Sequence, residues 1–218
     1  MRLPDARIVT ALVVIAGCLF ALWRGAGIVA FGAAQTFAKP DARAKAAQPW
    51  TATPGIASIA LGVSIVSTAV PLDVDLAAER RARLMDVLSL RPLASPYWLS
   101  LAGMEFAAGR AERIAPALSL SALTGPNEGP VMAHRALFGV ALWETLPADV
   151  RRHVINDLAG ARLGDREINQ FKLIMAGKKE QTRDAIRDAL LQTGRLSARL
   201  LAAYGIDAEQ PSGTVRQK

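Results

Sequence analysis

The residue types that most often carry catalysis or bind metals are sparse in this chain. Its two histidines, His134 and His153, are 19 positions apart, and Cys18 is its one cysteine. A structural zinc site usually needs four cysteine or histidine ligands. The sequence contains no nucleophile elbow, phosphate-binding glycine loop, HExxH or CxxC pattern. We therefore predict that the protein is not an enzyme and holds no metal ion and no cofactor.

Asp184 and Asp188 could form an acid–base pair, because residues four apart share one face of a helix. Arg183 and Arg187 stand directly beside them. Alternating opposite charges at these spacings are typical of a solvent-exposed helix face. We interpret the four residues as surface and not as an active site.

Composition limits the remaining classes of protein. The 218 residues are 51% hydrophobic and 21% charged, which suits one core or a short helical array. The net charge of +7 is spread along the chain and forms no basic block. A spread excess of arginine favours a solubilising surface over nucleic-acid recognition, so we expect no nucleic-acid partner.

The N-terminal segment has the composition of a membrane anchor. Apart from Arg24, residues Ile8 to Ala34 carry no charge. About 20 apolar residues cross the roughly 30 Å hydrocarbon core of a bilayer, and Arg24 can reach an interface with its long side chain. We predict that residues 1–34 form an uncleaved transmembrane helix.

Two alternatives to this anchor remain open. The small residues of FGAAQ after an apolar stretch resemble the end of a cleaved signal peptide. The run from Ile15 to Cys18, IAGC, resembles a bacterial lipoprotein box in which Cys18 would be lipidated. The sequence stays apolar after Cys18, whereas a mature lipoprotein becomes polar at once, so we favour the uncleaved anchor.

Basic residues flank the segment on both sides, so the positive-inside rule does not decide its orientation. A short basic N-terminus ahead of a first apolar segment commonly stays in the cytoplasm. We therefore expect a single-pass protein of the bacterial inner membrane whose C-terminal domain is periplasmic.

Two segments separate this anchor from the rest of the chain. Residues 35–54 are rich in alanine and proline without an apolar period, and we predict a flexible linker. Gly55 to Val70 is uncharged and rich in small residues, which favours burial against protein. In the alternative it also spans the membrane, and a cytoplasmic basic domain would contact anionic lipid through Arg151, Arg152, Lys178 and Lys179.

Prolines recur in the C-terminal part with a fixed period. Pro92 and Pro126 are 34 residues apart, and so are Pro96 and Pro130. In each pair the first proline follows an amphipathic stretch and the second precedes an apolar one. A proline ends a helix without penalty and fits the first turn of the next helix. The pattern therefore predicts two helix–turn–helix units in register.

This period and its residues resemble the tetratricopeptide repeat, a 34-residue pair of antiparallel helices. Matching positions are Trp98, Leu101, Ala102, Leu118 and Pro126, and the departures are Glu105, Ile114, Pro116 and Arg135. The resemblance covers residues 55–162. It implies an all-α protein in which a transmembrane helix precedes a short array of antiparallel helix pairs. Pro116 is expected to delay its helix to about Ala115 or to kink it.

By the same resemblance, the first helices of the array line a groove that binds partner proteins. The expected partner-binding residues are Leu99, Gly103, Phe106, Ala133, Leu137 and Val140. In so short an array, however, the C-terminal helices can close this face instead, and the sequence leaves that alternative open.

The resulting plan has four parts: an anchor (1–34), a flexible linker (35–54), a helical domain (55–205) and a disordered tail (206–218). We expect a membrane-anchored scaffold or accessory protein that recruits a protein partner to a membrane assembly of the cell envelope. Polysaccharide synthesis or export machinery is an expectation from analogy of fold alone. The alternatives are the two-span protein described above and a ligand-binding regulator with an unrecognised site.

Overall fold

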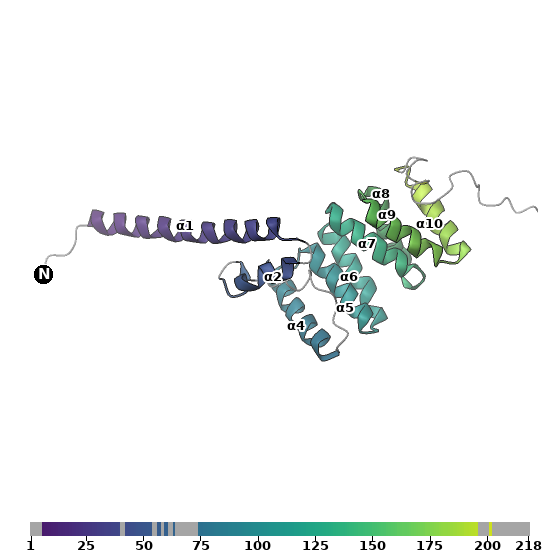
Figure 1. Cartoon of the computed structure of the whole chain (residues 1–218), viewed down its shortest axis with the longest axis horizontal. Coiled ribbons are helices and arrows are strands. Elements are labelled where there is room, and N and C mark those ends of the chain that lie inside the picture. The colour runs from purple at the N-terminus through teal and green to yellow at the C-terminus, as the bar shows by residue number, and fades with distance from the viewer. Residues whose placement is uncertain are drawn as a thin grey trace, which may run out of the picture. The chain divides into compact units, whose positions relative to one another are not determined.

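The computed structural model describes residues 6–39, 42–53, 56–57, 59–60, 63, 74–195 and 201. Every regular element within these ranges is a helix (Figure 1). The all-α prediction is therefore confirmed for the described part of the chain. Two compact units divide it, and each is described by itself. Unit 1 comprises residues 1–69 and 83–90, and unit 2 comprises residues 70–82 and 91–218.

Helix α1 (Ala6–Phe37) dominates unit 1, and Figure 1 shows it as one uninterrupted helix. Its segment Leu12–Phe37 is 26 residues long and apolar enough to cross a membrane. At 1.5 Å per residue, this segment extends about 39 Å, more than the hydrocarbon core requires. Large apolar side chains such as Val13, Leu19 and Leu22 are more than half exposed. A signal sequence would have the same properties, so that alternative stays open.

The chain folds back onto the C-terminal part of α1. Helix α2 (Arg43–Ala47) contacts α1, and the 3₁₀-helix η2 (Gln48–Trp50) follows it directly. Phe31 of α1 is buried in a cluster with Ala47, Ile56 and Ala60. The rings of Phe31 and Trp50 meet edge to face, with centroids 6.0 Å apart.

These contacts bear on the segments predicted between the anchor and the array. Within residues 35–54, predicted as a flexible linker, the described part contains two short helices and the buried Ala47. Most of the segment Gly55 to Val70 lies outside the described residues. Its described members Ile56 and Ala60 are buried against protein, as the favoured interpretation expects.

Unit 2 is built from pairs of helices. Helix α5 packs against α6 and α7 against α8, while α5 also contacts α7 and α6 contacts α8 (Figure 1). Helix α9 covers α7, and α10 packs on α8. The bounds are α5 (Ser95–Ala107), α6 (Ala111–Thr124), α7 (Gly129–Ala141), η3 (Trp143–Thr145), α8 (Ala148–Gly160), α9 (Asp165–Ala176) and α10 (Glu180–Gln192). Helix α4 (Val74–Leu90) contributes its first half to unit 2 and its last turns to unit 1.

The periodic prolines lie where the sequence predicts. Pro96 and Pro130 occupy the first turns of α5 and α7. Pro92 and Pro126 each follow the end of a helix by two residues, after α4 and α6. The turn between α5 and α6 uses Gly109, whose φ of 69° lies in the left-handed region that glycine adopts without strain.

Two helix predictions need correction. Helix α6 begins at Ala111, so a start near Ala115 is wrong, and Pro116 lies within the helix. Proline removes the N–H that would bond the carbonyl of Glu112, but both residues are exposed, so water can satisfy that carbonyl. In α4 the expected apolar stripe holds at Leu84, Val87 and Leu88, whereas Leu76 is 56% exposed.

The remaining elements follow the predicted pattern closely. In α8 the stripe of Val150, Val154, Leu158 and the adjoining Ala161 is buried. Helices α9 and α10 coincide with two of three apolar-periodic segments, EINQFKLIMAG, EQTRDAIRDALLQTG and RLSARLLAAYG, from which the sequence predicts closing helices. The third closing segment, 195–205, is described only at Arg195 and at the buried Leu201, and the predicted tail 206–218 lies outside the described residues.

A tight contact between α7 and α8 gives a stability test. Gly139 of α7 lies against Val154 of α8, and a Cβ atom at position 139 would overlap a methyl group of Val154. We expect Gly139→Ala to destabilise the protein by roughly 1–3 kcal/mol through overpacking. Gly103→Ala is the matched control, because a Cβ there meets nothing within 4 Å. It should stabilise α5 by about 0.5–1 kcal/mol. Chemical denaturation of the full chain in detergent measures both; equal effects would contradict the packing.

Candidate functional site

The structure separates the predicted partner-binding residues into two groups. On α5, Leu99 and Gly103 are partly buried, and Phe106 is 52% exposed. On α7, the residues Ala133, Leu137 and Val140 are all buried. The α7 residues belong to the core because this helix is enclosed by its neighbours, including α9. In this conformation an accessible partner surface can therefore include the α5 residues but not Ala133, Leu137 and Val140.

An aromatic pair marks the accessible part of this face. Phe106 of α5 meets Phe138 of α7 edge to face, with ring centroids 5.8 Å apart. Phe138, which the sequence analysis did not select, is partly buried. The two rings therefore join α5 to α7. Large, rigid aromatic side chains of this kind are common anchors in protein interfaces.

A buried ion pair lies at the centre of unit 2. The Arg135 Nε atom of α7 donates to Asp157 Oδ2 of α8 at 2.6 Å, and Nη2 donates to Oδ1 at 2.8 Å. Both residues are at most 4% exposed. This two-point contact matches the fork of a guanidinium to the two oxygens of a carboxylate. It joins α7 to α8 inside the core.

Arg135 also binds the preceding helix pair. Its Nη1 atom donates to the carbonyl of Ser121 at 2.8 Å and to the hydroxyl of Ser121 at 3.1 Å. Its Nη2 atom reaches the carbonyl of Gly125 at 3.4 Å. Each of the five N–H groups of the guanidinium therefore has an acceptor. One side chain connects the end of α6, the middle of α7 and the end of α8.

Two serines complete this network. The Ser95 hydroxyl donates to the Ser121 carbonyl, the Ser121 hydroxyl donates to the Ser95 carbonyl, and both distances are 3.0 Å. Both residues are fully buried. Reciprocal bonds of this kind hold the start of α5 against α6, and they leave no serine oxygen without a partner in a core where an unpaired polar group is costly.

Burial raises the pKa of Asp157 above its usual value, while the hydrogen bonds and charge of Arg135 and the charge of His153 act in the opposite direction. Placing the carboxylate in the core therefore has a cost that the guanidinium offsets only in part. A group whose pKa is raised on folding favours the folded state most at low pH. The Arg135–Asp157 pair thus specifies how α7 and α8 fit together more than it adds stability.

A second buried carboxylate holds the other end of α5. Glu105 is 1% exposed, and it accepts hydrogen bonds from the Nε atoms of Arg81 and Arg110, each at 2.5 Å. A charged residue in an apolar helix is expected on an exposed face, and for Glu105 this expectation is wrong. Burial acts to raise the pKa of Glu105, but the hydrogen bonds and charges of the two arginines outweigh it and hold the pKa below its usual value.

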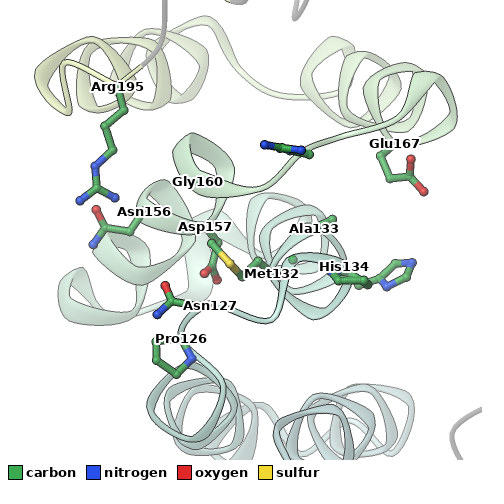
Figure 2. Close-up of a pocket in the computed structure, with 13 residues that line it drawn as sticks. Pro126, Asn127, Met132, Ala133, His134, Asn156, Asp157, Gly160, Glu167 and Arg195 are labelled. Atoms are coloured by element: carbon green, nitrogen blue, oxygen red, sulfur yellow. The ribbon is translucent and has the colours of Figure 1, made fainter.

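A pocket of about 660 Å³ opens beside the buried network, between the start of α7, the end of α8 and the start of α9. Figure 2 shows Asp157 and Met132 at its centre, with Arg195 and Asn156 extending toward one another. His134 lines the pocket, but Figure 2 shows its ring pointing away from the centre. Two of the helices that line the pocket, α7 and α8, are thus joined by the Arg135–Asp157 pair.

Only some of the charged side chains that line this pocket have an oppositely charged partner. The carboxylate of Asp157 is bound by Arg135, and Glu167 accepts the backbone N–H of Gly164 at 3.1 Å. Arg162 and Arg195 line the pocket, and the structure gives neither an ion pair among the residues that it describes. Glu167 also has no ion pair among the described residues, so two arginines and one carboxylate leave a net positive charge, which suits an anionic ligand.

The basic residues proposed for lipid contact have different surroundings. The Lys178 Nζ atom binds Glu144 Oε2 at 2.6 Å and the carbonyl of Ala141 at 2.7 Å. The Arg151 guanidinium lies 5.6 Å from the centre of the Trp143 ring. Arg152 and Lys179 are exposed. Two of the four cations therefore serve contacts within unit 2, which weakens the case for this surface as a lipid site.

The buried ion pair gives a sharp mutational test. We expect Asp157→Ala to destabilise the protein by roughly 3–5 kcal/mol, because it leaves the Arg135 charge buried and unpaired. The double variant Arg135→Met with Asp157→Leu should lose less than that single variant. Glu112→Ala is the surface control; its ion pair with Arg113 is long, at 3.8 Å, and exposed, so its loss should cost about 0–1 kcal/mol. Denaturation midpoints measure the differences. Additive losses in the double variant would contradict the coupling.

The second buried carboxylate predicts a dependence on pH. A carboxyl whose pKa is lowered on folding stabilises the protein above its unfolded-state pKa, and that stability is lost as pH falls through the folded-state pKa. Glu105→Gln should therefore be less stable than the unchanged protein at pH 7. The difference should shrink as pH falls below the usual glutamate value of 4.5. Thermal unfolding of both chains between pH 7 and pH 3 measures it; a constant difference would refute the assignment.

Comparisons of the chain with protein-family models, with curated proteins and with solved structures find no match.

Proposed function

We propose that this protein is a membrane-anchored helical scaffold that recruits a protein partner to an assembly of the bacterial inner membrane. Helix α1 is its single-pass anchor, and unit 2 is a short array similar to tetratricopeptide repeats that serves binding and not catalysis. The observation that carries the proposal is α1, whose most apolar segment has no buried residue although it is long enough to cross a bilayer.

The physical case for the anchor rests on exposed apolar surface. Large apolar side chains along α1 are each more than half exposed, namely Val13, Val14, Ile15, Leu19, Phe20, Leu22 and Trp23. Burying such a side chain contributes about 1.5–3 kcal/mol. Within the described residues, protein covers α1 only toward its C-terminal end, around Phe31. A bilayer would remove the rest of this surface from water.

The case for a repeat array rests on position and contact. Helices α5 and α7 begin 34 residues apart, at Ser95 and Gly129, and each carries proline in its first turn. Each packs on the helix that follows it, and the first helices contact one another, as do the second helices. This arrangement of neighbours is what a helical repeat requires.

The proposed partner surface centres on Phe106 and Phe138, with Leu99 beside them on α5. The half-exposed ring of Phe106, held edge to face against the partly buried ring of Phe138, offers a rigid apolar anchor at little cost in side-chain entropy. A partner segment with apolar side chains would complete their burial. Association with polysaccharide synthesis or export machinery remains part of this proposal by analogy of fold alone.

A second candidate function is favoured by the pocket beside Asp157. Its volume of about 660 Å³ falls within the range of small-molecule sites, and the uncommitted charges of Arg162 and Arg195 suit an anionic metabolite. In that case unit 2 would be a ligand-binding regulator. An anionic metabolite that raises the unfolding temperature of the full chain, but not that of Arg162→Gln with Arg195→Gln, would favour this function over the scaffold.

The anchor and its orientation can be tested together. We expect the full chain to stay in the membrane pellet after alkaline extraction, and a reporter active only outside the cytoplasm to be active when fused after Lys218. Gel mobility should show the uncleaved length. A soluble, shortened product would indicate a signal peptide instead. An inactive reporter on a full-length chain would favour the two-span alternative with a cytoplasmic domain.

Partner capture can be tested at the aromatic pair. A photo-crosslinking amino acid in place of Phe106 should trap a specific membrane-assembly protein in cells. The same residue in place of Leu123, which is 68% exposed on α6, is the matched control and should trap none. Equal crosslinking at both positions would show that the aromatic pair is not the binding surface.

A further inference from the structure

We propose that the residues described between positions 39 and 63 form a clamp at the membrane interface, which binds anionic phospholipid headgroups at the point where α1 leaves the bilayer. This inference rests on the proposed function, because it requires α1 to span the membrane. It goes beyond that function in assigning a binding surface, and a partner, to a segment whose sequence indicates only a linker and an apolar run.

The exposure of α1 shows where the lipid-facing part ends. The large apolar side chains described from Leu12 to Val29 are exposed, whereas Phe31 is only 8% exposed. Eighteen residues at 1.5 Å each extend about 27 Å, close to the thickness of the hydrocarbon core. The helix continues to Phe37, so its last two turns would pass through the headgroup layer. The residues that cover Phe31 would therefore lie at the level of that layer.

The residues that cover Phe31 combine apolar contacts with a partly exposed tryptophan, as is common at a membrane–water interface. Ala47, Ile56 and Ala60 bury its ring, and partly buried apolar residues surround them. Trp50 packs against Phe31 but remains partly exposed. Tryptophan is enriched at membrane–water interfaces because one part of its ring system is apolar while the indole N–H needs a polar partner. A folded segment that presents Trp50 beside the end of a span suits this depth.

The positive charge of the clamp favours anionic lipid headgroups. Lys39, Arg43 and Lys45 are exposed, and the structure gives none of them an ion pair among the residues that it describes. Asp41 is the one acidic residue in the sequence from Phe37 to Leu72. Basic residues next to a span are attracted to anionic headgroups, and the attraction weakens with salt. The short helix α2 places Arg43 and Lys45 within a few residues of the buried Ala47, so the cations accompany the part that packs on α1.

Depth-dependent fluorescence quenching of the full chain tests this placement. In a Cys18→Ser background, a fluorophore is attached at Gln48→Cys in the clamp, at Leu22→Cys in the span or at Leu123→Cys on unit 2; all three positions are exposed. The chains are reconstituted in phosphatidylcholine vesicles with or without phosphatidylglycerol. Spin labels are carried either on the lipid headgroup or deep in the acyl chain.

We expect the Gln48→Cys label to be quenched most by the headgroup spin label, and more strongly when phosphatidylglycerol is present. The variant Lys39→Gln, Arg43→Gln, Lys45→Gln should reduce that quenching about twofold or more in anionic vesicles, because the removed charges provide the attraction. The control variant Arg166→Gln, Lys172→Gln, Arg183→Gln removes three exposed cations from unit 2 and should change nothing. The Leu22→Cys label should be quenched most by the deep spin label in every vesicle.

The outcomes separate this inference from the proposed anchor. If Leu22→Cys is quenched by the deep label while Gln48→Cys is quenched no more than Leu123→Cys, the anchor stands and the clamp is refuted. If quenching at Gln48→Cys is the same with and without phosphatidylglycerol, or survives removal of the three cations, the preference for anionic lipid is overturned. If Leu22→Cys is not quenched at all, the span itself is wrong and both proposals fall.

Discussion

The arrangement of unit 2 depends on one buried ion pair. Arg135 holds Asp157 through two hydrogen bonds and uses its remaining N–H groups on backbone and side-chain oxygens of Ser121 and Gly125. A guanidinium can be buried only where all its donors are satisfied. That requirement fixes the distances between α6, α7 and α8 far more narrowly than apolar packing alone, which tolerates many side-chain arrangements. The same hydrogen bonds hold α7 and α8, which form two walls of the pocket beside Asp157.

Two of the three buried charged residues described in unit 2, Glu105 and Arg135, lie on first helices of the proposed pairs. Glu105 of α5 accepts hydrogen bonds from Arg81 and Arg110. Arg135 of α7 donates hydrogen bonds to Asp157. These are two of the positions at which the sequence departs from the tetratricopeptide pattern, where tyrosine and leucine are usual. At these two positions, hydrogen-bonded charges stand where the proposed repeat would have an aromatic or apolar side chain. Directional bonds link the helices there and leave the aromatic pair of Phe106 and Phe138 accessible.

The sequence predicts the helices of this protein better than its contacts. Local signals sufficed for the proline-bounded starts of α5 and α7 and for the buried stripe of α8, because capping and periodicity depend on neighbours along the chain. The burial of Glu105 depends on partners up to 24 residues away, so charge alone suggested an exposed site. Arg135 did interrupt an apolar helix, and that interruption was the available signal. The cover over Phe31 could not be predicted, since short alanine-rich helices have little periodicity of their own.

The geometry of Arg135 also restricts how this sequence can change over generations. Five donors in a planar fork cannot be replaced by the three donors of lysine, and either residue of the pair becomes a liability once the other is lost. A lineage that loses the Arg135–Asp157 pair must either pass through a destabilised single variant or exchange both residues together. Positions 135 and 157 are therefore expected to vary jointly among descendants of this chain, as an inherited pair and not as two independent sites.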